Sequence, residues 1–234
     1  LTASATPSEC GQCIGTAEVE VAGGTPPYTF AWTLNGTPVG ADSVVTNLCA
    51  GLYTATVQDA NGCLAALLVP ITDSNGEVVS TTDGITSCPG ECDGEVSASF
   101  ICSDPPCTVV WTDALGNDLN EPGTSLDSLC TGPYFIAVTN ASGCITIDTA
   151  TVVEPDPIVA QLSTTPVTCA GLCDGTATVG ISGGVGPYTI DWSPDPINGD
   201  GTPQVTDLCA GTYDLTITDA SGCTAIDSAT INES

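Results

Sequence analysis

The 234-residue sequence contains no lysine, arginine or histidine, and its 28 acidic side chains give a formal net charge of −28. Binding of nucleic-acid phosphates and of anionic lipids requires Lys and Arg, so no nucleic-acid partner is expected. Catalytic triads, Schiff bases, P-loops and His-ligated metal sites each need a cation or an imidazole. The composition therefore predicts that the chain is not an enzyme.

Long apolar runs are also missing. The longest apolar segment, 64–71, has the length of a strand, whereas a membrane-spanning helix needs about 18 or more apolar residues. No direct membrane insertion is expected. No signal peptide is visible, and Leu1 in place of methionine indicates a processed protein or a segment of a longer one.

Cysteine is abundant: the chain has 14, together with 26 glycines and 17 prolines. Secreted proteins oxidise such cysteines to disulfides, whereas cytosolic proteins seldom carry so many without a metal or redox role. Cys10-Gly-Gln-Cys13 has the CxxC form of redox proteins but lacks their strand–helix–strand context. Frequent Thr and Val, interrupted by Gly and Pro, favour short strands and tight turns. We therefore expect an ordered, extracellular, all-β protein.

Three copies of one cysteine pattern organise the chain. Each copy has a Leu-Cys-x-Gly-x-Tyr motif whose cysteine is followed, 14 positions later, by a second one; these pairs are Cys49 and Cys63, Cys130 and Cys144, and Cys209 and Cys223. Two further cysteines open each copy: Cys10 and Cys13, Cys88 and Cys92, and Cys169 and Cys173. The first cysteines of successive copies are 78 and 81 residues apart. This spacing predicts three tandem domains at 1–75, 76–155 and 156–234.

The third copy shows the strand pattern most clearly. Alternating apolar and polar residues predict strands A (158–165), B (176–182), C (188–192), a short E at Val205, F (213–218) and G (224–231). Trp192 on strand C and the Leu-x-x-Gly-x-Tyr stretch before strand F are typical of an immunoglobulin-like sandwich with a tyrosine corner. The predicted fold class is therefore all-β, with three tandem, disulfide-stapled immunoglobulin-like β-sandwich domains. Three small barrels are the alternative.

Three segments of the first copy form a recognisable motif set: 23–32 with its Gly-Gly-x-x-Pro-Tyr loop, 48–54, and 59–63 with its Asp-Ala-Asn-Gly-Cys turn. They resemble the SprB-type repeat of long cell-surface adhesins of Bacteroidota, which use type IX secretion and are linked to gliding motility and attachment. The third copy is similar, whereas the second departs at 102–107 and at Asn140. The resemblance implies the surface of a bacterium as location, and neighbouring repeats or identical chains as partners.

Strands B and F of such a sandwich begin at the same end, within disulfide reach. This geometry predicts Cys13–Cys49, Cys92–Cys130 and Cys173–Cys209, and the short 102–107 turn predicts Cys102–Cys107. The remaining cysteines are paired within or between domains: Cys10, Cys63, Cys88, Cys144, Cys169 and Cys223. One pairing joins neighbouring domains through Cys10–Cys144 and Cys88–Cys223 and leaves Cys63 and Cys169 for neighbouring units or chains. The other pairs Cys10 with Cys63, and their equivalents, inside each domain.

Oxygen-rich side chains suggest two further kinds of site. Asp195, Asn198 and Asp200 loosely resemble a calcium loop, although an Asx-turn loop explains them as well, and no other metal or cofactor is expected. Bacteroidota glycosylate hydroxyls in Asp-Ser/Thr-apolar triplets. The resemblance therefore implies candidate O-glycosylation sites at Ser43, Ser128, Thr149 and Ser228. An ordinary solvent-facing hydroxyl is the alternative at each position.

These features predict the load-bearing shaft of an extracellular surface adhesin or filament, which trypsin-type proteases cannot cut because Lys and Arg are absent. A self-assembling extracellular fibre protomer is one alternative. Another is a glycan-binding adhesion module that uses its B–C and F–G loops, around 26–28 and 61–62. Only three Trp residues exist, one per copy at the predicted core position, and this favours the shaft.

Overall fold

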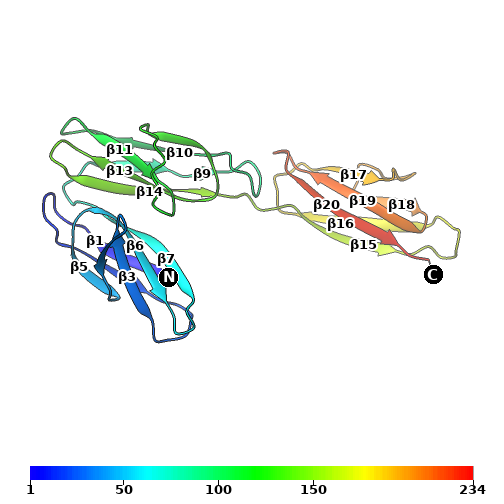
Figure 1. The fold of residues 1–234 in the computed structure, drawn as a ribbon. Helices are drawn as coiled ribbons and strands as arrows, with labels where there is room; N and C mark the ends of the chain where they lie inside the picture. Colours follow the sequence, from blue (N-terminus) through cyan, green and yellow to red (C-terminus); the bar gives the residue numbers. More distant parts are fainter. Residues whose placement is uncertain (234) are drawn as a thin grey trace. The chain divides into compact units, whose positions relative to one another are not determined.

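The computed structural model describes residues 1–233, which form strands and turns (Figure 1). The first copy has two facing sheets, in the strand orders β1-β2-β5 and β4-β3-β6-β7. Its strands are β1 (Thr2–Thr6), β2 (Gly15–Glu20), β3 (Thr29–Leu34), β4 (Thr37–Gly40), β5 (Val44–Leu48), β6 (Gly51–Gln58) and β7 (Leu64–Ile71). Within the described residues, no helix is long and apolar enough to cross a membrane.

The other two copies repeat this arrangement. The second has the sheets β12-β10-β8 and β11-β13-β14-β9, and the third has β15-β16-β18 and β17-β19-β20. The second contains β8 (Val79–Thr82), β9 (Gly84–Ile85), β10 (Gly94–Phe100), β11 (Thr108–Thr112), β12 (Ser125–Leu129), β13 (Gly132–Thr139) and β14 (Ile145–Val153). The third contains β15 (Val159–Thr165), β16 (Gly175–Ser182), β17 (Thr189–Ser193), β18 (Gln204–Leu208), β19 (Gly211–Thr218) and β20 (Thr224–Ile231).

Each copy is an immunoglobulin-like sandwich, because strands A, B and E form one sheet and strands C, F and G form the other. The predicted fold class is confirmed. In the third copy the predicted strands A, B, C, F and G correspond to β15, β16, β17, β19 and β20, and Val205 lies in β18. The parallel pairing of β9 with β14 adds a fourth strand to the second sheet of the middle copy.

One tryptophan fills the core of each sandwich. Trp32, Trp111 and Trp192 are at most 1% exposed, and each lies in a separate cluster of buried apolar side chains. Their indole N–H groups donate to backbone carbonyls at Asp42, Gly123 and Thr202, so no buried donor is left unpaired there. The predicted core role of the tryptophans is confirmed.

A glycine at the start of strand B sits against the opposite sheet in every copy. A Cβ on Gly175 would lie 2.6 Å from Ile231 Cγ2 and 3.0 Å from the Leu208 carbonyl oxygen. Gly15 and Gly94 occupy the same position in the other copies and are equally crowded. These glycines are therefore required by close approach between the sheets.

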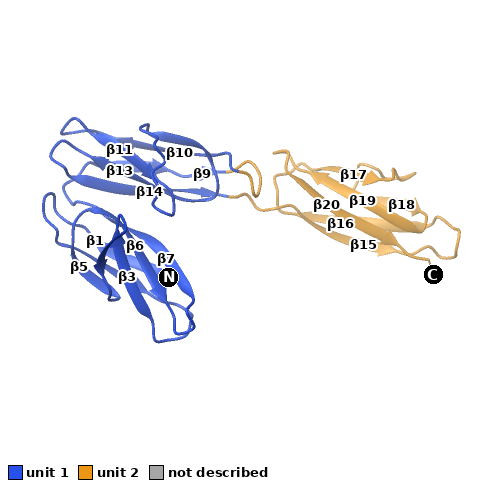
Figure 2. Ribbon diagram, viewed as in Figure 1, with its two compact units in different colours: residues 1–85, 92–153 blue, residues 86–91, 154–234 orange. Residues whose placement is uncertain are grey.

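The chain divides into two compact units, residues 1–85 with 92–153 and residues 86–91 with 154–234 (Figure 2). The first unit contains the first and second sandwiches. The second unit contains the third sandwich and the segment 86–91, which comes from the start of the second sequence copy. The boundaries of three separate domains, at 75/76 and 155/156, stay a prediction.

Candidate functional site: the cysteine-linked ends of the sandwiches

All 14 cysteines lie in the described part of the chain, and 12 of them form six disulfides. Three disulfides join the start of strand B to the segment just before strand F: Cys13–Cys49, Cys92–Cys130 and Cys173–Cys209. A fourth, Cys102–Cys107, closes the short turn before β11. The first three are the pairs expected from strand topology, and the fourth is the pair expected from the short 102–107 turn.

A tyrosine corner lies beside each of the three B-to-F disulfides. The hydroxyl of Tyr53 donates to the Cys49 carbonyl at 3.0 Å, and Tyr134 and Tyr213 donate in the same way to Cys130 and Cys209. The corner therefore fixes the backbone of the cysteine that precedes strand F.

Two further disulfides connect different sequence copies. In the first unit Cys10 bonds to Cys144 with 4.9 Å between the Cα atoms. Backbone pairing continues beside it, because the Asp73 amide donates to the Ile145 carbonyl at 2.8 Å. The Ile145 amide donates to the Asp73 carboxylate at 2.9 Å. Of the two pairings left open by the sequence, the structure contains the one that joins neighbouring copies.

The second unit contains the equivalent disulfide, Cys88–Cys223, with 5.5 Å between the Cα atoms. The Cys88 turn is also held by the Gly90 amide, which donates to the Glu154 carboxylate at 3.2 Å. In both cases the first cysteine of one copy bonds to the F–G turn of the next. We call these two bonds the cross-repeat disulfides.

The B-to-F and cross-repeat disulfides connect into one covalent path. It runs along strand F of each copy, at 49–63, 130–144 and 209–223, and through the cysteine turns 10–13, 88–92 and 169–173. We call this path the covalent spine. Its two ends are Cys63 and Cys169, which are free and exposed.

The F–G turn at one end of each sandwich is rigidly built. In the first copy the Asp59 carboxylate accepts hydrogen bonds from the amides of Thr25 (3.0 Å) and Cys63 (2.9 Å). In the third copy Asp219 accepts likewise from Val185 and Cys223, each at 2.9 Å. These amides, Thr25 and Val185 first, hold the pKa values of both carboxyl groups below the ordinary aspartate value. The turn carboxylate thus locks the B–C loop to the F–G turn.

The second copy reaches the same lock with different residues. Asn140 replaces the turn aspartate, and its side-chain oxygen still accepts from the Cys144 amide at 3.0 Å. The missing carboxylate is supplied from the B–C loop by Asp104, which accepts from the Ser142 amide at 2.9 Å and the Ser142 hydroxyl at 2.6 Å. The departure at 102–107 is therefore compensated within the same pair of loops.

The residues of the predicted calcium loop are engaged with the chain itself. The Asp200 carboxylate accepts from the Trp192 amide at 3.3 Å, and the Asn198 side-chain amide donates to Asp207 at 2.5 Å. Asp195 is exposed. Within residues 1–233 no group of three or more His, Cys, Asp or Glu side chains has an arrangement that could hold a metal ion.

The four candidate glycosylation hydroxyls differ in exposure. Ser128 and Ser228 are exposed, whereas Ser43 and Thr149 are partly buried. Thr149 in β14 and Ser228 in β20 lie at equivalent positions of strand G. Ser128 has a positive φ of 56° and donates to Asp127 at 3.0 Å.

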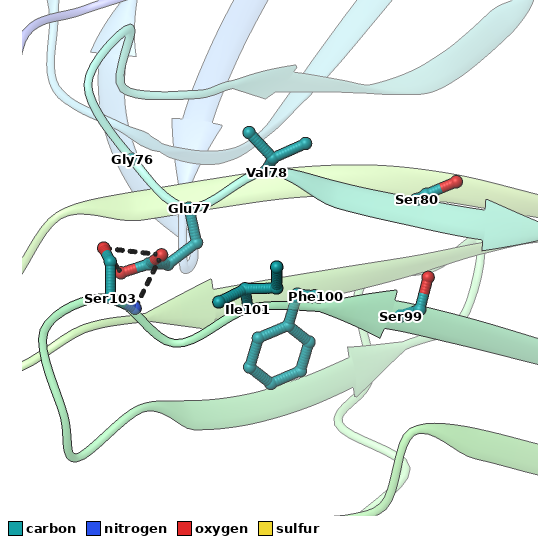
Figure 3. A pocket seen from close by; sticks show the side chains of 8 residues that line it. All are labelled: Gly76, Glu77, Val78, Ser80, Ser99, Phe100, Ile101 and Ser103. Carbon is teal, nitrogen blue, oxygen red and sulfur yellow. Dashed lines mark hydrogen bonds between the residues drawn. The ribbon is translucent and has the colours of Figure 1, made fainter.

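An apolar groove of about 480 Å³ lies between the start of β8 and the end of β10 (Figure 3). Val78 and Ile101 line it and are more than 80% exposed. The carboxylate of Glu77 turns toward Ser103, whose amide and hydroxyl donate to it at 3.1 and 2.9 Å (Figure 3). These bonds lower the pKa of Glu77. Glu77, the charged side chain that lines the groove, is therefore hydrogen-bonded to Ser103 of the same copy. The sequence analysis does not identify this residue.

Two segments of the chain, residues 2–37 and 162–196, match the SprB repeat family. The resemblance expected from the motifs is confirmed for the first and third copies. No curated protein sequence matches the chain.

Several solved structures resemble the chain at low identity. They include three N-terminal domains of the outer capsid protein Hoc of bacteriophage RB49 (12% identity, TM-score 0.35, 100% of this chain and 98% of that chain). Titin domains I67–I69 match with 12% identity and a TM-score of 0.31 over 97% and 94% of the two chains. The N-terminal eight Ig domains of the cell adhesion molecule DSCAM match with 13% identity and a TM-score of 0.35, over 98% of this chain and 41% of that chain.

Proposed function

We propose that the chain is a shaft segment of an extracellular, bacterial cell-surface adhesin or filament, with tension carried by the covalent spine. The observation behind this proposal is the pair of cross-repeat disulfides, which turn three sandwiches into one cross-linked series. Such bonds limit how far successive repeats can separate under tension, as a shaft requires. Disulfides of this number also require an oxidising compartment, in agreement with an extracellular location.

The spine follows the strand best suited to bear load. Strand F (β6, β13 and β19) is hydrogen-bonded to strands C and G on its two sides in every copy. It also contributes buried core residues such as Ala55, Ile136 and Leu215. Because strand F is already extended, tension along the spine finds little slack.

The surface charge fits a shaft. With 28 carboxylates and no Lys, Arg or His, neighbouring shafts repel each other at low ionic strength and stay apart. O-glycans at the exposed Ser128 and Ser228 would add to this separation. Digestion by trypsin-type enzymes is excluded by the absence of Lys and Arg.

The glycan-binding alternative relied on the loops around 26–28 and 61–62. Their polar groups largely bind each other: the Tyr28 hydroxyl donates to the Gly23 carbonyl at 2.9 Å, and the Asn61 side chain donates to Thr25 at 2.9 Å. These contacts leave few groups to recognise a sugar, and they support the shaft as the main function.

Single-molecule stretching tests the proposal. The chain is held by its two ends and pulled, first oxidised and then after reduction. A shaft limited by the spine stops extending early when oxidised and extends several-fold further when reduced. Equal extension limits in both states would refute the load-bearing function.

A further inference from the structure

The two free thiols occupy positions that are bonded elsewhere in the same chain. Cys63 stands at the end of the F–G turn, as Cys144 and Cys223 do in the other copies. Cys169 is the first cysteine of its copy, as Cys10 and Cys88 are. Each free thiol therefore stands at a position whose equivalents form the cross-repeat disulfides.

The half that carries Cys63 is already folded into the bonded conformation. In the Cys63 turn, the Asp59 amide donates to the Cys63 carbonyl at 3.1 Å, and the Gly62 amide to the Asp59 carbonyl at 3.0 Å. The corresponding distances in the Cys223 turn are 2.9 and 3.1 Å. The conformation of this turn therefore does not depend on the disulfide.

The half that carries Cys169 is preformed as well. The Leu172 amide donates to the Cys169 carbonyl at 3.1 Å, as Glu91 donates to Cys88 at 3.1 Å in the bonded turn. The glycines at equivalent places in the two turns, Gly171 and Gly90, both have φ = 82°. Little conformational entropy is lost when such turns dock.

The backbone contact beside the disulfide also has its counterpart. Ser8 and Asp73 form a parallel bridge in the first copy, and Val167 and Glu233 form the same bridge in the third. Asp73 is the residue that pairs with Ile145 next to Cys144. Glu233 thus stands where it could pair in the same way with Leu64, next to Cys63.

Cys63 is more exposed to solvent than the bonded cysteines at the equivalent positions. Cys144 and Cys223 are only 6% and 8% exposed, whereas Cys63 is exposed and Leu64 is 68% exposed. A groove of about 140 Å³ beside Cys63 is lined mainly by apolar residues such as Val21, Tyr28 and Ala65. The turn 169–172 has no charged residue and ends in Leu172, which is 49% exposed. An uncharged apolar turn suits this groove on a chain whose net charge is −28.

We propose that separate molecules of this chain join head to tail through a disulfide between Cys169 of one molecule and Cys63 of the next. The partner is a second molecule of the same chain, because every molecule carries both Cys63 and Cys169. Repetition of one heterologous contact builds an open filament. The bond extends the covalent spine without interruption from copy to copy. This inference rests on the proposed shaft function and supplies its partner.

The bond forms by thiol–disulfide exchange with an external disulfide RSSR, such as oxidised glutathione or a disulfide oxidoreductase. The Cys169 thiolate attacks RSSR, which gives a mixed disulfide and releases RS⁻. The Cys63 thiolate of the docked copy then attacks the Cys169 sulfur and releases the second RS⁻. Two protein thiols lose two electrons and two protons, and RSSR is reduced to two RSH.

The test uses two full-length variants, Cys63→Ser and Cys169→Ser, which are incubated alone and mixed with oxidised glutathione. The mixture is expected to give a dimer and nothing longer, with Cys63 joined to Cys169 in the peptide map. Each variant alone stays monomeric, and the unsubstituted chain forms a ladder of multimers on non-reducing gels. Both substitutions are at exposed thiols, and circular dichroism verifies that the variants fold.

Two outcomes overturn the proposal. One is the absence of a dimer in the mixture although both thiols react with glutathione. The other is formation of Cys63–Cys63 or Cys169–Cys169 dimers at the rate of the mixed pair, which would mean random collision. Docking that stabilises the mixed pair by about 1.4 kcal/mol makes it react about tenfold faster than the Cys63–Cys63 or Cys169–Cys169 pairs.

A second variant pair tests docking without altering a cysteine. Leu172→Ser is expected to slow the mixed reaction several-fold, whereas Leu115→Ser, at an 83% exposed leucine of the second copy, leaves the rate unchanged. An equal rate for both variants would show that the apolar turn does not dock. Stretching of the monomer tests the shaft function separately, so the two proposals can fail independently.

Discussion

Removal of individual disulfides changes the maximum length to which the chain can be stretched, by amounts that the covalent spine determines. When the two ends are pulled, the shortest covalent route uses the middle of the covalent spine, 130–144 and 88–92, together with the terminal segments 1–10 and 223–234. The outer parts of the spine, at 49–63 and 209–223, lie off this route and carry tension only when Cys63 and Cys169 are themselves linked. The rest of the chain lies in closed loops that carry no end-to-end extension. At about 3.5 Å per residue, this route and its three disulfides limit the oxidised chain to ~150 Å, against ~800 Å for the reduced chain.

Each cross-repeat disulfide contributes a definite part of this limit. Without Cys10–Cys144, the route passes through Cys13–Cys49 and Cys88–Cys223 and lengthens to ~230 Å. Without Cys88–Cys223, it passes through Cys10–Cys144 and Cys173–Cys209 and again reaches ~230 Å. Without both, the limit rises to ~440 Å because only the loops inside each copy remain closed.

Optical-tweezer or atomic-force stretching of the Cys→Ser pairs measures these limits directly. Removal of Cys102–Cys107 is the matched control, because this bond lies off the route and its loss leaves the ~150 Å limit unchanged. An oxidised chain that extends well beyond ~150 Å would refute the spine, and so would single removals that leave the limit where it was.

Glycine packing, the turn carboxylate, calcium binding and glycosylation can each be tested separately. Gly175→Ala is expected to destabilise the third sandwich by about 1–3 kcal/mol through overpacking, whereas Gly180→Ala in the same strand, with no atom nearer than 3.8 Å to the new Cβ, is neutral in thermal melts. Because the folded-state pKa of Asp59 is lowered, its contribution to stability is present above the ordinary aspartate pKa and is lost as the pH falls through the folded value. Asp59→Asn should therefore lower the melting temperature at neutral pH, with a difference that shrinks in acid; a difference independent of pH would contradict this. Melting curves in chelator and in millimolar calcium should coincide, because the side chains of Asn198 and Asp200 are bound within the chain. The intact mass of native material should exceed that of the bare sequence if the exposed hydroxyls carry glycans, and an equal mass would remove that proposal.

Features that depend on a single sandwich were predictable from the sequence. Strand order places the starts of B and F at one end, so Cys13–Cys49 and its equivalents follow from topology. Trp192 and the tyrosine before strand F also have roles that the fold itself assigns. The partner of Cys10 was not predictable, because it depends on how one sandwich meets the next, and alternation along a strand contains no information about that.

Two local features were missed although the sequence contained a signal for each. Gly15, Gly94 and Gly175 all stand two positions after the second cysteine of their copies, a regularity that indicates a steric requirement. Asp104 appears in the B–C loop of the one copy whose F–G turn has lost its aspartate to Asn140. A single turn can be read from its own residues, but an exchange between two loops becomes visible only when the copies are compared position by position.

Because the chain has no cationic side chain, salt bridges between side chains cannot connect its repeats, and disulfides connect them instead. Interfaces between repeats are often held by opposite charges. All 28 charged side chains of this chain are acidic, so those of neighbouring repeats can only repel each other. At the F–G turn the carboxylate accepts hydrogen bonds from amides of the same copy. The cysteine that ends the turn bonds to the preceding copy, as Cys144 and Cys223 do. The one turn therefore both closes its own sandwich and presents the thiol that joins it to its neighbour. Repetition of that turn in every copy is what allows a covalent spine to continue through any number of them.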